Sequence, residues 1–260
     1  MKKNAPKKIK ISVALATHNE EENIVDCIES LKKFADEIIV LDGGSNDRTS
    51  QLASQCGAKV FSTSNQQMFH INKNLAINHC TGDWIFQIDA DERITSALAN
   101  ELKAVVLSHP KENGFWINRK NWFLGGFLKK GGAYPDPVIR FFRKGKGHLP
   151  EISVHEQIEI NGSVGHLKSD ILHLADPNFK RYLERSDRYT SLTAERLKEE
   201  KVKKNLTTML IYYFLKPTGT FFNVYIRHKG YQDGFRGFVW ALFSASHYFY
   251  AYTKYWGGKE

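Results

Sequence analysis

The first hundred residues alternate between two hydrophobic periods, and this alternation limits the possible folds more than any other feature. Short apolar runs occur at residues 11–16, 37–42, 58–61 and 83–89. Runs of this length, rich in valine and isoleucine, are typical of buried strands. Amphipathic segments separate them. Apolar strands that alternate with helices predict a doubly wound α/β fold, with a mostly parallel sheet and helices on both of its faces.

The segments between these runs carry apolar residues at helical spacing. The predicted helices lie at residues 24–34, 46–55 and 66–79, with a fourth that begins near residue 95. Thr95 suits the N-cap of this fourth helix. In the third helix we expect Ile71, Leu75 and Ile77 to lie together on one side.

The pattern changes at Gly114. Short strand-like stretches at 114–119, 138–143 and 155–160 are separated by glycine-rich turns, and from about Phe179 the chain reads as helical to its end. The predicted domains are a catalytic α/β domain and a helical, membrane-associating extension. Their bounds are 1–177, divided into halves 11–113 and 114–177, and 178–260.

Positive charge and aromatic residues coincide in the extension. Residues 178–260 contain 15 Lys and Arg against 7 Asp and Glu, and 17 of the 33 aromatic residues lie between Tyr212 and Trp256. This combination suits an anionic membrane surface or a nucleic acid, and it also suits an aromatic helical core with a solvated basic face. We expect no nucleic-acid partner, since charge is nearly balanced over 1–177 and no nucleic-acid-binding motif is present.

Several features concern the compartment. The basic start, MKKNAPKKIK, is followed by an apolar stretch too short for a signal peptide, and GFVWALFSASHYFYAYT is too polar for a membrane span. The three cysteines show no metal-like pairing and favour a reducing compartment. We therefore expect a cytoplasmic protein, bound peripherally to the inner face of the plasma (inner) membrane.

Three aspartates follow predicted strands. Asp42 ends one strand before two glycines, and Asp89 and Asp91 follow another. Ligands of doubly wound sheets bind at the carboxyl ends of the strands, and paired carboxylates there can hold Mg²⁺ or Mn²⁺. The alternative is that they are loop or helix-capping acids. The sequence contains neither the dinucleotide fingerprint nor a Walker lysine motif, so it does not bind NAD or ATP in those ways.

Three stretches, in this order along the chain, favour the ligand-binding alternative. ISVALATHNEEENIVDCIESL, ADEIIVLDGGSNDRT and NKNLAINHCTGDWIFQIDADE together resemble the nucleotide-sugar-binding half of inverting family-2 glycosyltransferases, which have the GT-A fold. The resemblance implies that Thr17 and Glu20 lie near the base and ribose and that Asp42 holds the uracil. It also implies that Lys73 lies near the nucleotide or pyrophosphate, Asp89 contacts the ribose and Asp91 binds the metal.

Later stretches narrow the resemblance to one branch. GGAYPDPVIRFFRKGKG, VHEQI and LHLADPNFKRYLERSDRYTSLTAE are similar to the bacterial lipopolysaccharide or lipooligosaccharide inner-core glucosyltransferases, which add a β-1,4 glucose to a core heptose. This implies a UDP-sugar donor, UDP-glucose in particular, a divalent metal (Mn²⁺ or Mg²⁺), and a lipid A/inner-core saccharide acceptor. Other membrane-linked saccharides or proteins remain alternative acceptors.

An inverting transfer needs a base that deprotonates the acceptor hydroxyl. Glu156 is the first candidate, with His155 beside it, and Asp136, held between two prolines, is the second. Lys129, Arg140, Arg143 and His155 are candidates for binding the acceptor, because cationic side chains suit phosphate groups. We expect His166 and His173 to be core histidines.

Overall fold

The computed structural model describes residues 9–66, 68–151 and 157–258. The chain forms two compact units. Unit 1 comprises the chain up to Arg119 together with Pro137–His173, and unit 2 comprises Lys120–Asp136 together with the chain from Leu174 onward. The predicted boundary near residue 177 remains a prediction.

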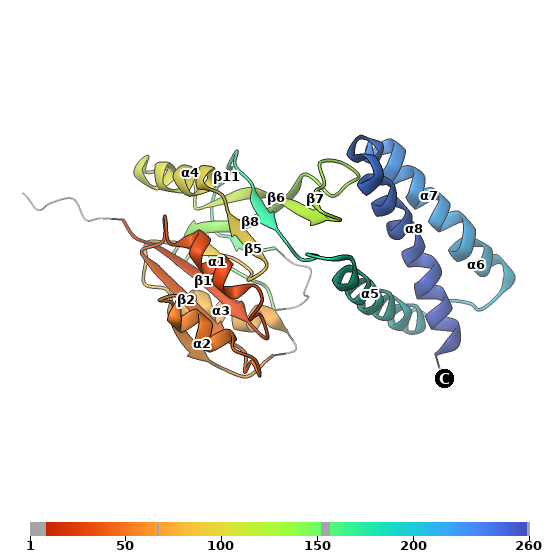
Figure 1. Cartoon of the computed structure of the whole chain (residues 1–260), viewed down its shortest axis with the longest axis horizontal. Helices are drawn as coiled ribbons and strands as arrows, with labels where there is room; N and C mark the ends of the chain where they lie inside the picture. Colours follow the sequence, from red (N-terminus) through yellow and green to blue (C-terminus); the bar gives the residue numbers. More distant parts are fainter. Residues whose placement is uncertain (1–8, 67, 152–156, 259–260) are drawn as a thin grey trace, which may run out of the picture. The chain divides into compact units, whose positions relative to one another are not determined.

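The elements up to His173 alternate between strand and helix and then become purely β (Figure 1). They are β1 (Ile11–Thr17), α1 (Ile24–Leu31), β2 (Glu37–Asp42), α2 (Thr49–Gln55), β3 (Lys59–Ser62), α3 (Phe69–His79), β4 (Trp84–Gln87), β5 (Glu92–Ile94), α4 (Ser96–Leu107), β6 (Gly114–Phe123), β7 (Gly126–Phe127), β8 (Asp136–Arg143), β9 (Gly147–His148), β10 (Glu159–Ile160), β11 (Val164–His166) and β12 (Ile171–His173).

The main sheet has the strand order β3-β2-β1-β4-β8-β6-β12-β5. Its first four strands are parallel, because a helix returns the chain after each of β1, β2 and β3. Beyond them β8 runs antiparallel to β4, and β12 antiparallel to β5. The structure therefore confirms the predicted fold class, a GT-A-like α/β sheet with helices on both faces, and adds an antiparallel second part.

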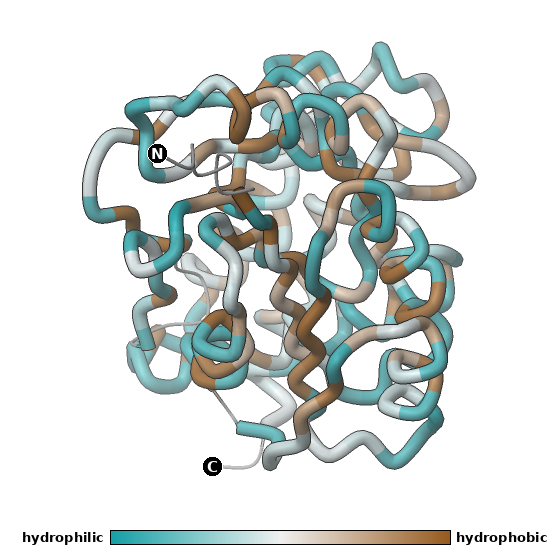
Figure 2. The backbone as a smooth tube through the Cα atoms, turned by 90° about the vertical axis from the view of Figure 1, so that its left-hand side faces the viewer, coloured by the Kyte–Doolittle hydropathy of each residue, from teal (hydrophilic) through white to brown (hydrophobic). Residues whose placement is uncertain are grey.

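The sheet separates two hydrophobic cores. Val13 and Leu15 of β1 face a core that includes α1, α2 and α4, whereas Ala14 faces the core beneath α3. This alternation is the two-residue period of a strand that is buried on both sides. In Figure 2 hydrophobic stretches of the chain, in brown, lie near the middle of the view, and much of its outer part is hydrophilic, in teal.

Two helices differ from the sequence prediction. The helix α2 begins at Thr49, not at residue 46, because the Asp47 carboxylate accepts hydrogen bonds from the Thr49 hydroxyl and N–H and so caps the turn. In α3 the prediction for Leu75 was wrong, since this side chain is exposed; the buried residues are His70, Asn72, Ala76 and Ile77. Polar residues replace apolar ones on the inner side of α3 where it approaches the candidate site. Thr95 caps α4 as predicted.

Unit 2 is built largely from helices. They are α5 (Phe179–Glu199), α6 (Leu206–Leu210), η1 (Ile211–Leu215), α7 (Lys216–Phe222), η2 (Asn223–Arg227), η3 (Gly230–Asp233) and α8 (Gly234–Gly257). The helix α8 packs against both α5 and α7 (Figure 1). Tyr182 and Val239 form one core with Phe123, and Tyr212 and Tyr252 stack in another. None of the helices in the described part of the chain has both the length and the apolar character needed to cross a bilayer.

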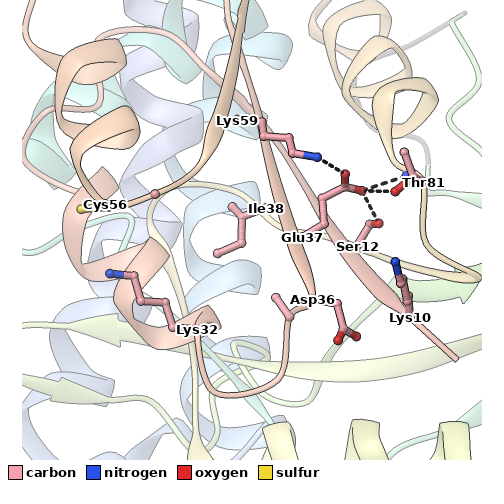
Figure 3. Close-up of a pocket in the computed structure, with 11 residues that line it drawn as sticks. Lys10, Ser12, Lys32, Asp36, Glu37, Ile38, Cys56, Lys59 and Thr81 are labelled. Atoms are coloured by element: carbon pink, nitrogen blue, oxygen red, sulfur yellow. Dashed lines mark hydrogen bonds and ion pairs between the residues drawn. The ribbon is translucent and has the colours of Figure 1, made fainter. Parts of the chain in front are cut away.

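A buried carboxylate ties three strands together at the amino end of the parallel sheet. Glu37 lies in a pocket of about 370 Å³ (Figure 3), where it accepts hydrogen bonds from the Ser12 hydroxyl at 2.7 Å and from the Thr81 N–H at 2.8 Å. Lys59 lies 2.9 Å from its other oxygen. Burial alone would raise the pKa of Glu37, but these donors outweigh it and lower the pKa to about 2. Ionised Glu37 therefore stabilises the junction of β1, β2 and the turn before β4.

This depressed pKa predicts a pH-dependent stability. Because the pKa is about 2 in the folded protein and 4.5 normally, the stabilisation is fully present above pH 4.5 and is lost as pH falls toward 2. We expect Glu37→Gln to lower the free energy of unfolding by about 2–3 kcal/mol at pH 7, as measured by urea denaturation. The difference from wild type should shrink between pH 5 and 2. The exposed Glu22→Gln is the control, and a difference that does not change with pH would contradict the interpretation.

Candidate active site

A pocket of about 320 Å³ lies at the carboxyl end of the parallel strands of unit 1. Its walls come from the loop after β1, from α3 and from the loop after β4, and it is the meeting point that the sequence predicted for those strand ends. The lining residues are Ala16, Thr17, His18, Glu20, Asn65, Phe69, Asn72, Lys73, Asp89, Ala90, Asp91 and His173.

The loop after β2 comes close to the end of β1. The Gly43 N–H donates to the carbonyl of Thr17 at 2.8 Å. A Cβ atom at Gly43 would lie 3.2 Å from the Asn72 amide nitrogen and 3.3 Å from the Thr17 carbonyl, so a side chain there would be crowded. The next residue, Gly44, has a φ of +72°, which favours glycine. The GG pair thus lets this loop approach the base of the pocket.

Two buried polar atoms on the pocket wall have no hydrogen-bond partner within the described residues. They are the Thr17 hydroxyl and the side-chain oxygen of Asn72, and both residues are about 5% exposed. Buried polar groups in folded proteins are normally hydrogen-bonded, because an unpaired group costs about 1–3 kcal/mol. A polar ligand in this pocket would supply the missing bonds.

Asp89 is the most heavily coordinated carboxylate of the site. One of its oxygens lies 2.6 Å from Lys73 Nζ and accepts from Gln87 Nε2 at 3.2 Å; the other lies 2.6 Å from Arg140 Nη2. Burial alone would raise the pKa of Asp89, but Arg140 and Lys73 hold it well below its usual range. A carboxylate offers about four acceptor positions, and the described residues occupy three of them on Asp89, only one of these on the Arg140 side.

Arg140 extends this ion pair into the interior. Its Nη2 also lies 3.0 Å from Glu92, which is fully buried, and its Nη1 donates to the side chain of Gln87. Glu92 in turn accepts from the Asp89 N–H, while its own N–H donates to the Asp89 carbonyl. The turn from Asp89 to Glu92 is therefore closed by two reciprocal bonds, and Arg140 neutralises the carboxylate at each end of it.

Asp91 contacts a different partner. Its Oδ2 lies 3.4 Å from Nε2 of His173, the last residue of β12, which pairs with β5. Burial alone would raise the pKa of Asp91 and lower that of His173, yet the bond between them lowers the pKa of Asp91 and raises that of His173. Among the described residues, none binds the second oxygen of Asp91, in contrast to the coordinated Asp89.

The donor set bears on whether a metal ion fits. Among the described residues, no group of three or more His, Cys, Asp or Glu side chains is arranged to hold a metal ion. Mg²⁺ and Mn²⁺ sites that include a substrate diphosphate need only one or two protein carboxylates, because water and phosphate oxygens complete the coordination. Asp91, with an oxygen not engaged by the described protein, fits such a site; Asp89, neutralised by two cations, fits it less well.

Two further predicted donor-binding residues differ in their placement. Glu20 lines the pocket, and its carboxylate accepts from the Asn23 amide at 2.8 Å. Asp42 is buried beneath the loop after β2, where it accepts from the Ser45 N–H and hydroxyl. It is not among the described residues that line the pocket. The bonds to Ser45 hold the loop after β2. The direct contact with uracil that we predicted remains a prediction.

The predicted acceptor contacts of two arginines are not favoured. Arg140 is buried against Asp89 and Glu92, so its charge is already neutralised. Arg143 pairs with Trp84 at the other end of β4, stacks over that ring at 4.5 Å and donates to the carbonyls of Pro110 and Glu112. Successive side chains of β8 alternate between the two faces of the sheet, and β8 runs antiparallel to β4. The two arginines therefore lie apart, which their spacing in the sequence alone did not reveal.

The remaining candidates are less constrained by the structure. Asp136 begins β8 within unit 2 and accepts from the Asn121 amide at 3.2 Å. Lys129 is exposed in unit 2, and its N–H donates to Asp233. Glu156 and His155 lie outside the described residues. The roles predicted for these four residues remain predictions.

Sequence reasoning missed several residues of the pocket, of which His173 and Asn72 bear most on its chemistry. His173, which we expected in the core, contacts Asp91 because β12 pairs with β5 far away in the sequence. Asn72 lies one residue before Lys73 on α3. An asparagine on the inner side of this helix was the only sequence feature that could have indicated a pocket residue. Pairing between distant strands has no local signature, so His173 could not be found from its neighbours.

The mixed sheet and the acidic pocket at its carboxyl edge define a GT-A-like α/β protein. Residues 12–123 match glycosyl transferase family 2, and this part of the chain is a family 2 glycosyltransferase domain. The chain is 28% identical over 253 residues to the lipopolysaccharide core biosynthesis glycosyltransferase LpsC of Rhizobium meliloti. The aligned region covers 95% of this chain and 92% of LpsC. The chain is also 28% identical to a glycosyltransferase of Rickettsia typhi, over 88% of this chain and 81% of that protein.

Solved structures agree with the fold. Staphylococcus aureus TarS gives a TM-score of 0.51 with 18% identity, covering 87% of this chain and 46% of the TarS chain. TarS 1-349 in complex with UDP-GlcNAc gives a TM-score of 0.50 with 16% identity, covering 95% of this chain and 88% of that chain. At these identities the likeness concerns the fold alone.

The geometry predicts unequal costs for removing the two cations that contact Asp89. Arg140→Met would leave the fully buried Glu92 with only the more distant Arg119, at 3.5 Å, and Asp89 with only Lys73, so we expect a loss of about 3 kcal/mol in the free energy of unfolding. Lys73→Met would leave Arg140 in place and should cost about 1 kcal/mol or less. Urea denaturation at pH 7 measures both. Equal losses for the two variants would contradict the central role given to Arg140.

Proposed function

We propose that this protein transfers a hexose, glucose in particular, from a UDP-sugar with inversion onto an inner-core heptose of lipopolysaccharide or lipooligosaccharide. The single observation that carries the proposal is the pocket after β1 and β4, whose wall combines three carboxylates with two unpaired buried polar atoms inside a family 2 domain. The likeness to LpsC along almost the whole chain supports the acceptor class.

The donor would bind with its uridine near the loops that follow β1 and β2. The unpaired Thr17 hydroxyl and Asn72 oxygen suit the donors and acceptors of a nucleoside, and Glu20 lies on the same wall. The remaining acceptor position of Asp89 suits a ribose hydroxyl. Lys73, paired with Asp89 at 2.6 Å, supplies positive charge for the diphosphate. TarS, which has a similar fold, was solved with UDP-GlcNAc, and this agrees with a UDP-sugar donor.

Asp91, oriented by His173, is the residue proposed to hold a divalent cation, Mn²⁺ or Mg²⁺. When bound, such an ion neutralises charge that develops on the departing diphosphate. The protein's own contribution is geometric: the bond to His173 directs one carboxylate oxygen away and leaves the other for the ion and the substrate. Arg140 neutralises the negative charge of the neighbouring Asp89, so this charge does not disturb the orientation of the Asp91 carboxylate.

The transfer itself is a single displacement. The acceptor hydroxyl forms a bond to the anomeric carbon while the bond from that carbon to the diphosphate oxygen breaks, and the hydroxyl proton passes to a base. Glu156 is the proposed base, with His155 beside it, and Asp136 is the alternative. Lys129 remains a proposed contact to acceptor phosphate, whereas Arg140 and Arg143 are engaged by the protein.

A membrane-held acceptor implies that the enzyme works at a lipid surface. We propose a peripheral position on the inner face of the plasma (inner) membrane, through the helical region from residue 178 to the end. The excess of lysine and arginine there supports an anionic lipid partner. No feature of the described pocket favours a nucleic acid as the partner.

The donor proposal is tested by calorimetry with UDP, with and without MnCl₂. We expect metal-dependent binding, and we expect Asp91→Asn to weaken it about tenfold or more because one carboxylate ligand is lost. Asp26→Asn changes an aspartate whose side chain is 78% exposed on α1 and serves as the matched control. Metal-independent UDP binding, unchanged in Asp91→Asn, would contradict the proposed metal role.

The donor pocket also predicts opposite effects on binding and on stability. Thr17→Val keeps the shape of the side chain and removes a hydroxyl that lacks a partner in the described protein. We expect unchanged or slightly higher stability, because no hydrogen bond within the protein is lost, together with UDP affinity lower by about tenfold. Thermal unfolding and UDP calorimetry measure the two effects. A less stable variant with normal UDP affinity would mean that the hydroxyl serves the protein alone.

Substrate identity is tested by a screen of UDP-sugars, with UDP release as the signal, run with and without a truncated inner-core acceptor. We expect the greatest stimulation with UDP-glucose and an acceptor that contains heptose. If only another membrane-linked saccharide or a protein stimulated UDP release, the proposed inner-core acceptor would be wrong and that molecule would be the acceptor. If none of the UDP-sugars were turned over, the transferase proposal would be wrong.

A further inference from the structure

One long helix of unit 2 carries an exposed apolar stripe. The segment Leu206–Arg227 is continuous through α6, η1, α7 and η2. Six large apolar side chains on it are between 45% and 67% exposed. Leu215 stands beside Phe214, and the other five form the stripe: Leu206, Leu210, Phe214, Phe222 and Ile226. They stand at multiples of four residues from one another. This regular spacing would be unusual for side chains exposed by chance.

Two π turns keep this stripe on one side of the helix. In an α-helix four residues turn about 400°, so a four-residue repeat drifts by about 40° at each step and would wind around the helix. A π turn rotates less per residue, because its hydrogen bonds join residues five apart. The π turns η1 and η2 alternate with α6 and α7. The smaller rotation per residue in the π turns therefore offsets the drift of the stripe that accumulates in the α-helical turns.

The helix α8 carries a second exposed stripe. Phe235, Leu242, Phe249 and Trp256 recur every seven residues and are between 39% and 76% exposed, with Phe238 beside them at 40%. A seven-residue repeat drifts by only about 20° per step on an α-helix. Their surroundings on α8 include the buried Ala245 and Tyr252, which pack inward.

Aromatic contacts join the two stripes into one surface. The ring of Tyr213 lies 4.8 Å from that of Phe249, and Phe221 lies 6.0 Å from Phe238. Phe221 also lies 5.9 Å from Phe222, which belongs to the first stripe. The two helices lie side by side in Figure 1. We call the ten residues of the two stripes the apolar face. A contiguous exposed apolar surface of this kind marks an interaction site.

The charge around the apolar face is almost wholly positive. From Lys201 to Gly258 the sequence has eight Lys and Arg residues and a single acidic residue, Asp233. The Asp233 carboxylate is occupied, since it accepts from the N–H groups of Lys129 and Lys130. A protein partner for so basic a surface would have to be acidic and also present a large apolar face, whereas a layer of anionic lipid has both properties.

Lysine ammonium groups lie over aromatic rings of unit 2. Lys216 Nζ lies 3.8 Å from the centre of the Tyr212 ring, and Lys204 Nζ lies 4.7 Å from Tyr255 and 6.0 Å from Trp256. These are cation–π contacts, so positive charge that can bind phosphate stands directly beside aromatic side chains that suit an apolar layer. Lys204 also lines a pocket of about 380 Å³ together with Lys198 and Lys254.

We propose that the apolar face, formed by α6–η2 and α8, is the surface by which this protein lies on an anionic lipid layer, with lipid phosphate groups bound by Lys204 and its neighbouring lysines. The inference deepens the proposed function, on which it rests for the membrane-held acceptor. It specifies which side chains enter the lipid and which bind the head groups. The helices lie along the layer, since each has one exposed apolar side and one side packed in unit 2.

The test is flotation of the full-length protein with vesicles of phosphatidylcholine alone or mixed with phosphatidylglycerol. We expect binding only to the mixed vesicles, and weaker binding at high salt. Phe214→Ser/Phe222→Ser should reduce vesicle binding about tenfold or more, because two exposed rings leave the interface. Lys203→Gln/Lys204→Gln should reduce it about fivefold for each lysine.

Matched controls separate the surface from general effects. Leu107→Ser removes an apolar side chain that is 75% exposed on α4 of unit 1, and Lys111→Gln removes an exposed charge there; both should bind vesicles like wild type. Thermal unfolding verifies that each variant is folded. UDP calorimetry on the same variants distinguishes this proposal from the donor proposal, since unchanged UDP binding with lost vesicle binding supports only the surface.

Three outcomes would overturn the inference. The first is wild-type protein that ignores anionic vesicles at low salt, and the second is a phenylalanine variant that binds them normally. The third is a wild-type dimer that Phe214→Ser/Phe222→Ser converts to a monomer, measured by light scattering, because the apolar face would then join two copies of this chain.

Discussion

The ion cluster around Arg140 is the interaction on which the candidate site depends. This guanidinium, buried in β8, neutralises Asp89 and Glu92 at 2.6 and 3.0 Å and also binds Gln87. It thereby joins the last parallel strand, β4, to its antiparallel neighbour β8, and it closes the turn that carries Asp91. Without it, three acidic side chains would lie close together in the interior, where like charges repel and burial favours neutral forms.

The different environments of Asp89 and Asp91 follow from this cluster. Two carboxylates one residue apart have the same chemistry in the sequence, yet one is held by two cations and the other by a histidine. The first is a fixed, neutralised acceptor, whereas the second retains an oxygen that the described protein does not engage. A single strand-to-loop transition is enough to separate the environments of two neighbouring residues.

Much of the fold could be predicted from the sequence, because its signals are local. The apolar runs that became β1, β2 and β4 and the cap at Thr95 need only neighbouring residues. The meeting of Asp89 with the loop after β1 followed from the rule for parallel sheets. The contacts of His173 and Arg140 depend on which distant strands pair, and the burial of Asn72 depends on what α3 covers. These are tertiary facts, and no local pattern encodes them.

The unpaired hydroxyl of Thr17 and the unpaired oxygen of Asn72 have a consequence for how this protein could be altered. A sequence selected for stability alone would fill these positions with apolar side chains, since each unmet hydrogen bond weakens the empty protein. Their retention marks a place where stability and ligand binding compete. Substitutions chosen only to raise stability would therefore be selected at these two positions early. The resulting protein would be more stable but would bind its ligand less tightly.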